Sequence, residues 1–576
     1  MDRRLRGNGV GEGRGRSRVQ RLLGIGPLAT LCLAFTLAAC SAGRSAPEAS
    51  GAEPLTRAEA TDYRETSRYA DVVAFLDAVA AMDPAIHIGT FGTSVEGRDL
   101  PLAAWGARGA TPEAVRAEAG KTRVLVFANI HAGEVAGKEA ALMLLRDLAS
   151  GANAQWKDSL VVMIAPIYNA DGNERIAPGN RGPQMGPVGG MGQRPNAQGL
   201  DLNRDFMKLA SPEARALVGL LRDADPHIVV DLHTTNGTHM GYHLTYAPPL
   251  SPNTPAPIDR HLREGWFPAI SAEILRTDDM ATDHYGNVPG AFGEPATAPR
   301  GWYTFSPQPR FGTNYGGLRN RYAILSEAYS YATFRDRVHV TKRFVEEILH
   351  RAHAEATRVR AQTEAADRQT LVGDSLAVRG GFTAPESTRE MLLGAVDSLT
   401  HPVTGAPMLR MREGVRTPEA MPVFSRFEAT ERERVPAGYL VPERFEAVLD
   451  LLAAHGVRTE SPPEDAAVEE VEQFFADSVR VAAREFQGIR QRELFGAWRP
   501  VVQPAPGSEG RPPPPGPPVQ FDWDSYVYVP MDQPLARVAF ALLEPRSDDG
   551  VVNWNLIRVE YPQPTPVYFI LRLAAR

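Results

Sequence analysis

The feature that most limits the fold of this chain is a regular alternation of short apolar runs with amphipathic segments of helical period. The apolar runs, rich in valine and isoleucine, occupy residues 122–130, 159–169, 227–233 and 321–329, and segments of helical period at 134–149 and 211–224 lie between them. Strands that alternate with helices form mostly parallel sheets covered by helices on both faces. We therefore expect an α/β fold with a mixed, mostly parallel sheet sandwiched by helices.

Ionisable side chains follow or end three of these apolar runs. His131 and Glu134 come directly after the first run, His233 ends the third, and Glu327 lies near the end of the fourth. Each alone is explained equally well as a structural residue, but a carboxylate inside an apolar strand is costly unless it is paired or functional. The carboxyl ends of parallel strands meet at one sheet edge, where α/β proteins bind ligands, so the four residues form a candidate site. Imidazoles and carboxylates are zinc donors, and three of them leave a catalytic ion one open position.

The chain is too long for one ordinary core. Its 576 residues predict at least two domains, which we place at 63–355 for the α/β domain and 356–576 for an accessory α+β domain. The second region contains the helix-like "RFEAVLDLLAAHG", the strand-like "SYVYVPM" and "VYFILRL", and the proline-rich "RPPPPGPP". The proline run predicts an extended loop over 504–518.

The N-terminal 39 residues have the composition of a secretory signal. Seven arginines precede an apolar run that ends in "LAAC", which is typical of a bacterial lipoprotein signal with cleavage before Cys40 and lipid on its thiol. We therefore predict a signal peptide over 1–39, a polar tether over 40–62, and an exported protein lipid-anchored to the bacterial cell envelope. An uncleaved membrane anchor is the alternative, and the glycines and proline in the apolar run are unfavourable for it.

The charge balance argues against nucleic acid as a partner. The whole chain has a formal charge of −7, and residues 1–39 hold seven arginines against Asp2 and Glu12, a net +5, so the remainder carries −12. Such an acidic protein has no bulk attraction for nucleic acid. Cys32, the other of the two cysteines, lies within the predicted signal, so the processed chain has no pair of thiols for a disulfide.

Five motifs resemble, in order and kind, the zinc metallocarboxypeptidases of the carboxypeptidase A type. They are "IHAGE", "IYNADGNER", "GLDLNRDF", "VDLHTTN" and "AILSEAY", preceded by "GTSVEGRDLPL", which is similar to that family's opening hairpin. The resemblance covers about half of the chain and implies the family's α/β sandwich with one zinc ion. It also implies His131, Glu134 and His233 as the zinc ligands, and Glu327 as the general base that passes a proton from water to the leaving amine.

The resemblance further implies that the substrates are peptides with a free C-terminal carboxylate. Asn203 and Arg204 match the pair that holds this carboxylate, and the planar fork of arginine suits that contact. An arginine that stabilises the oxyanion is expected in the long loop 176–199. We choose Arg194 for this role, with Arg181 as the second choice.

Departures from the family's pattern leave the side-chain preference open. The tyrosine that folds over the substrate has no clear match, although Tyr303 and Tyr315 precede Glu327 at suitable distances. "HTTN", "NADG" and "SEAY" differ from the digestive members and suggest a bacterial branch. Two alternatives remain: a related zinc amidohydrolase (a deacylase of N-acyl amino acids or a peptidase trimming peptidoglycan peptides), and a catalytically silent binding protein on the same scaffold. Retention of all three ligands and Glu327 argues against the silent protein.

The predicted lipid attachment is tested at Cys40. Without its thiol, Cys40→Ser should leave the membranes or accumulate as unprocessed precursor, which cell fractionation and mass spectrometry of the mature N-terminus would detect. A wild-type mature N-terminus at any other residue would contradict the lipoprotein signal.

Overall fold

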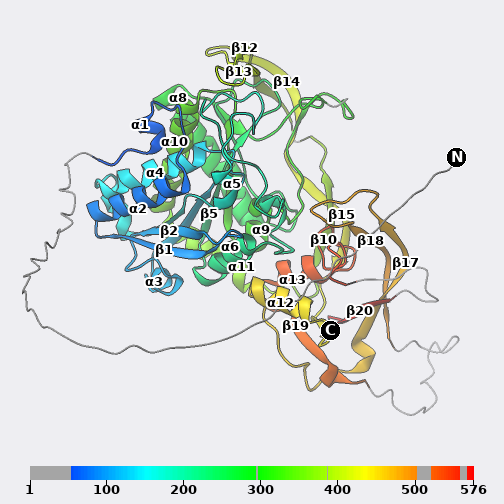
Figure 1. The fold of residues 1–576 in the computed structure, drawn as a ribbon. Helices are drawn as coiled ribbons and strands as arrows, with labels where there is room; N and C mark the ends of the chain where they lie inside the picture. Colours follow the sequence, from blue (N-terminus) through cyan, green and yellow to red (C-terminus); the bar gives the residue numbers. More distant parts are fainter. Residues whose placement is uncertain (1–52, 294–295, 386, 502–520, 558–566, 576) are drawn as a thin grey trace, which may run out of the picture. The chain divides into compact units, whose positions relative to one another are not determined.

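The computed structural model describes residues 53–293, 296–385, 387–501, 521–557 and 567–575 (Figure 1). The predicted signal peptide, Cys40 and the proline-rich loop 504–518 lie outside the described residues. Among the helices that the described residues form, none is long and apolar enough to cross a lipid bilayer.

An eight-stranded mixed sheet forms the centre of the fold. In spatial order its strands are β1 (Ile86–Thr93), β2 (Asp99–Trp105), β4 (Leu160–Ala165), β3 (Thr122–Ala128), β5 (Ile228–Thr235), β9 (Tyr322–Tyr329), β6 (Leu244–Ala247) and β7 (Thr282–His284). The four central strands β4, β3, β5 and β9 are parallel, and β2 and β6 run antiparallel to them. The mostly parallel sheet predicted from the sequence is confirmed.

Successive residues of the central strands face opposite layers, because side chains alternate along a strand. In β3, Val124 and Val126 share a buried cluster with helices α2 (Tyr69–Met82), α4 (Ala136–Ala149), α8 (Phe267–Asp278) and α10 (Phe334–Ala354). Leu125 and Phe127 share another with α6 (Pro212–Asp223) and α9 (Gly312–Leu318). Both faces of the sheet are therefore apolar, which confines ionisable groups to the ends of its strands.

The C-terminal region is rich in β structure, as expected. Its largest sheet is antiparallel, in the order β18 (Arg492–Pro500), β17 (Val471–Val481), β20 (Val567–Leu573), β16 (Gly438–Pro442) and β19 (Tyr526–Pro530). Smaller sheets join β10 (Ser375–Phe382) to β15 (Phe427–Arg434), β12 (Val396–Thr400) to β13 (Pro407–Met411), and β11 (Thr388–Leu393) to β14 (Thr417–Phe424) and β8 (Trp302–Tyr303).

The C-terminal region completes the second core of the central sheet. Helices α12 (Glu446–His455) and α13 (Ala536–Leu543) belong to the same buried cluster as Leu125 and Phe127 of β3. The side chain of Val538 and that of Leu542 in α13 are fully buried. The two regions therefore share one apolar core, and ion pairs such as Arg310–Asp549 add polar contacts between them.

Two segments at the predicted domain boundaries pack on the α/β layers. Residues 53–62, the last part of the predicted tether, include α1 (Arg57–Ala60), whose Glu59 accepts two hydrogen bonds from Arg146 of α4 at 2.7 and 2.8 Å. Beyond residue 355, α11 (Ala356–Arg368) continues on the sheet, where Thr122 of β3 donates to the Ala356 carbonyl at 2.9 Å. Both segments therefore pack against the α/β layers, and the domain bounds 63–355 and 356–576 stay predictions.

Candidate active site

A tight turn at the end of β3 holds the first two candidate donors. Asn129 has a φ of 66°, a left-handed conformation that asparagine tolerates, and it redirects the chain out of the strand. The Glu134 backbone N–H then donates to the His131 carbonyl at 2.8 Å, just before α4 begins. Gly133 leaves space for Arg181, because a Cβ at this position would lie 2.5 Å from the Arg181 Cδ.

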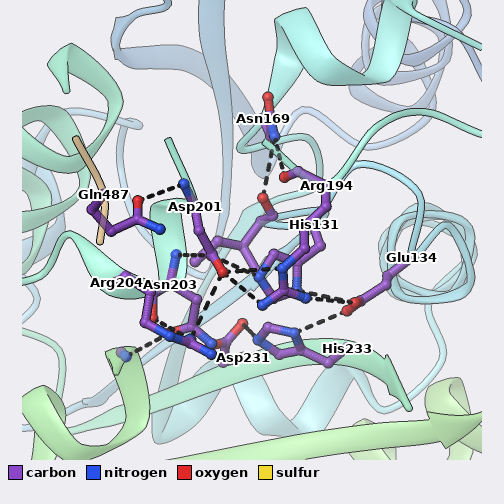
Figure 2. A network of polar contacts seen from close by, with 12 residues as sticks. His131, Glu134, Asn169, Arg194, Asp201, Asn203, Arg204, Asp231, His233 and Gln487 are labelled. Atoms are coloured by element: carbon purple, nitrogen blue, oxygen red, sulfur yellow. Dashed lines mark hydrogen bonds and ion pairs between the residues drawn. The ribbon is translucent and has the colours of Figure 1, made fainter. Parts of the chain in front are cut away.

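The Glu134 carboxylate joins the two imidazoles (Figure 2). It lies 3.0 Å from His131 Nδ1 and 2.9 Å from His233 Nδ1, and the ligand atoms of the three residues all lie within 4.8 Å of one another. His233 comes from β5, whose Leu232 pairs with Ala128 at the end of β3. All three side chains are buried. The structure therefore brings together the three donors predicted from separate motifs.

Each imidazole also has a second carboxylate on its other ring nitrogen. Asp201 Oδ1 lies 2.9 Å from His131 Nε2, and Asp231 Oδ1 lies 2.9 Å from His233 Nε2. Without a cation, both nitrogens of each ring would need a proton to face two carboxylates. With a cation at the three donors, each ring is neutral, presents its Nδ1 lone pair inward and directs Nε2–H outward, which is how protein ligands of zinc are usually held. The residues present therefore fit a zinc ion.

The pKa values in this cluster show the same charge compensation. Burial opposes ionisation of Glu134, but His131 and Arg181 hold its pKa well below the usual range. Burial likewise lowers the pKa of His233, yet Asp231 and Glu134 raise it well above its ordinary value. For Glu134 and His233 the attraction between opposite charges together outweighs the effect of burial.

Glu327 is placed beside the cluster by strand register. In the parallel pairing of β5 with β9, Glu327 is the partner of His233. Burial raises the pKa of Glu327 to about 8, although His233 opposes the effect. A carboxylate with a raised pKa next to a metal site has the properties of a general base.

Asn203 and Arg204 lie on a short 3-10 turn, η2 (Leu202–Arg204), that Asp201 caps. Asn203 Oδ1 accepts from the Gly312 backbone N–H at 2.9 Å, so α9 fixes this side chain. The Arg204 guanidinium lies over the Phe311 ring at 4.0 Å and forms a long ion pair of 3.9 Å with Asp201. Its Nη1 donates to the Asn203 carbonyl at 2.7 Å, which leaves other N–H groups of the guanidinium for a further anion.

The three metal donors, Glu327, Asn203 and Arg204 line one cavity of about 230 Å³. It is lined by His131, Glu134, His233, Glu327, Asn203 and Arg204, and by Arg181, Arg194, Tyr285, Phe292, Phe305, Phe311, Thr313 and Leu325 among others. Its wall therefore combines three metal-donor side chains, three guanidinium groups and several aromatic rings.

Both candidate oxyanion arginines line the cavity. Arg194 donates to Asp201 at 2.7 Å, and its Nη1 lies 3.2 Å from His131 Nδ1. Arg181 donates to Glu134 Oε1 at 2.8 Å. Arg194 also lies 3.8 Å from Glu134, so both guanidinium groups adjoin the three metal donors and the choice of Arg194 stays a prediction.

Neither tyrosine considered from the sequence lines the cavity. Tyr303 is stacked on Phe424 at 4.2 Å, and its hydroxyl donates to Pro299 O. Tyr315 is fully buried in α9, with its hydroxyl 2.8 Å from His455 Nδ1. Tyr285, which follows β7, lines the cavity instead, and no motif in the sequence marks it.

These features define a metallohydrolase-type site at the edge of an α/β sheet. Comparison with known proteins identifies the domain: residues 72–256 match the zinc carboxypeptidase family. The chain therefore carries a zinc carboxypeptidase domain, which confirms the resemblance found in its motifs, and zinc is the metal of that family.

Curated relatives match over the same part of the chain. Carboxypeptidase 2 of Trichophyton rubrum is 32% identical over 144 residues, which cover 24% of this chain and 23% of that protein. Carboxypeptidase D of Rattus norvegicus is 33% identical over 159 residues, covering 23% of this chain and 12% of that protein. The chain thus spans less than a quarter of the length of these two relatives.

Among solved structures, a metallo-carboxypeptidase from Burkholderia cenocepacia is 20% identical, with a TM-score of 0.37 over 50% of this chain and 70% of that one. The fold assignment rests on the strand order and register given above.

The metal site yields a direct prediction. Wild-type protein should contain one zinc per chain, and His131→Ala or His233→Ala should lose it while staying folded, as measured by elemental analysis and circular dichroism. His239→Ala, which alters an exposed histidine outside the cluster, is the matched control and should keep its zinc. Stoichiometric zinc in the His131→Ala/His233→Ala double variant would refute the assignment.

Proposed function

We propose that this protein is a zinc-dependent carboxypeptidase that removes C-terminal residues from peptides. The observation that carries the proposal is the lining of one cavity: three zinc donors, the half-buried Glu327, and Arg204. Arginine binds a carboxylate through two parallel hydrogen bonds, so Arg204 with Asn203 is suited to hold the terminal carboxylate of a peptide.

The chemistry follows from the position of each side chain. Zinc, when bound, supplies Lewis acidity that lowers the pKa of a water molecule and polarises a carbonyl group. Glu327 accepts the proton of the attacking water and delivers it to the nitrogen of the leaving amine. Asp201 and Asp231 keep both imidazoles in the tautomer that directs Nδ1 toward the donor cluster.

A guanidinium group stabilises the negative charge that develops on the carbonyl oxygen. We assign this role to Arg194, which lines the cavity beside His131. Fixed cationic donors at this position lower the barrier because they need no reorganisation during the reaction. Arg181, beside Glu134, is the second choice.

The location of the protein is a further part of the proposal. The arginine-rich leader and "LAAC" support export and lipid attachment at Cys40, which would place the catalytic domain at the cell envelope. Its substrates there would be peptides with free C-termini. The net charge of −12 outside the leader supports the absence of nucleic-acid partners.

Two other functions are separable from this one. A related zinc amidohydrolase, acting on N-acyl amino acids or peptidoglycan peptides, would share the metal chemistry and differ in the leaving group. A silent binding protein would share only the scaffold. The assembly of three donors and Glu327 in a single cavity favours a working hydrolase.

Glu327 is tested by removing its charge and keeping its shape. Glu327→Gln should lower kcat by roughly 10²–10⁴-fold, the usual size of general-base effects, because no group remains to accept the water proton. Zinc content should not change. Glu428→Gln, at an exposed carboxylate in β15, is the control and should behave as wild type. A fully active Glu327→Gln enzyme would rule out the mechanism.

Arg204 is tested with paired substrates. Arg204→Ala should reduce kcat/KM for free-acid peptides by an amount corresponding to roughly 2–5 kcal/mol, because the substrate carboxylate loses its partner. Amidated peptides lack that charge and should be affected little. Arg204→Lys keeps the charge without the planar fork, so its kcat/KM for free-acid peptides should lie between the values of the wild type and Arg204→Ala. Equal losses for both substrate types would point to an endopeptidase or a deacylase.

A further inference from the structure

A hairpin of the C-terminal region reaches the active site. Strands β17 and β18 pair as far as Val481 with Arg492, and residues 482–491 continue beyond this pair. The tip is closed by two backbone hydrogen bonds between Phe486 and Ile489, of 2.8 and 3.1 Å, which leave Gln487 and Gly488 as a two-residue turn. This tip lies close to the catalytic residues (Figure 2).

The residue at the first turn position is unusual. Gln487 has a φ of 53° and Gly488 a φ of 74°. Two-residue turns with both φ values positive favour asparagine, aspartate or glycine, and Gly488 fits this rule whereas Gln487 does not. A long side chain held in a left-handed conformation is unfavourable for the backbone, and such positions are often functional. The turn alone therefore gives no reason for glutamine.

The side chain of Gln487 supplies a reason. Its Oε1 accepts a hydrogen bond from the Asp201 backbone N–H at 2.9 Å. Asp201 contacts His131 Nε2 at 2.9 Å and Arg194 at 2.7 Å, and it caps the turn that carries Arg204. One contact from the hairpin thus fixes the backbone of the segment that orients a metal ligand and presents the carboxylate-binding arginine.

The hairpin is anchored next to the cavity wall. Phe486 stacks on Trp554 at 6.3 Å, and the Arg310 guanidinium lies 5.2 Å from the Phe486 ring and 4.8 Å from the Trp554 ring. Arg310 is also paired with buried Asp549 at 2.7 Å. Arg310 directly precedes Phe311, whose ring lies under Arg204. The hairpin therefore packs against a residue that adjoins the cavity wall.

We propose that Gln487 is a positioning residue of the active site, through which the C-terminal region holds the Asp201–Arg204 segment in its working geometry. The proposal rests on the carboxypeptidase function for its effect on substrate binding. Its effect on the metal ligand His131 does not depend on which amide the enzyme cleaves. The catalytic unit then includes residues 482–491, almost 300 residues from Asp201 along the chain.

The test uses the full-length protein and three substitutions. Gln487→Gly removes the acceptor and suits the positive φ, so its melting temperature should match or exceed that of the wild type. Gln487→Glu keeps an acceptor oxygen at the same chain length. Arg484→Ala changes an exposed residue of the same hairpin and is the control. The measurements are melting temperature, zinc affinity by chelator competition, and KM and kcat for a free-acid peptide.

In Gln487→Gly we expect zinc to bind roughly three- to tenfold more weakly and KM to rise by a similar factor, the usual scale for one lost hydrogen bond. Gln487→Glu should restore both values, and Arg484→Ala should not change them. Wild-type KM and zinc affinity in Gln487→Gly would overturn the proposal, whatever the melting temperature. If the wild type cleaves no free-acid peptide but Gln487→Gly still weakens zinc binding, the carboxypeptidase function fails and the positioning role stands.

Discussion

Burial of both faces of the central sheet is the constraint on which the site depends. Helices or C-terminal elements cover each face of β3, β5 and β9, so a charged side chain can be accommodated only where these strands end. His131, His233 and Glu327 occupy that edge, and the parallel register sets His233 beside Glu327. The site residues are therefore brought together by two conditions: the faces of the sheet must stay apolar, and the parallel pairing of β3, β5 and β9 aligns the strand ends.

Charge balance is the second condition on the site. Glu134, Asp201 and Asp231 surround two imidazoles, and Arg181 and Arg194 offset part of their charge. Buried ions are tolerated only when they are paired, and a divalent cation completes the pairing without protonating either ring. Because such an ion binds the folded state alone, its binding free energy also stabilises the fold.

Much of this arrangement could be predicted from the sequence, because it depends on local patterns. Apolar runs located the strands, and the polar residues at their ends located the donors. Asp231 could have been found too, since it lies two residues before His233 and residues two apart share one face of a strand. Tyr285 and Gln487 could not, because Tyr285 lines the cavity from the segment after β7 and Gln487 contacts Asp201 from a hairpin tip, and the paths of both segments depend on tertiary contacts. For the same reason, the sequence distance from Glu327 did not identify a tyrosine of the cavity: Tyr303 stacks on Phe424, and Tyr315 contacts His455.

The shared core has a consequence for how the protein is made. The strands and helices of the α/β domain leave the ribosome before α13, yet α12 and α13 pack on α6 and α9, the helices that cover one face of its sheet. Until α13 has been synthesised, the outer apolar surface of α6 and α9 lacks its cover, and an exposed apolar surface favours aggregation. The last apolar surface of the catalytic domain is therefore buried only when nearly the whole chain has been made.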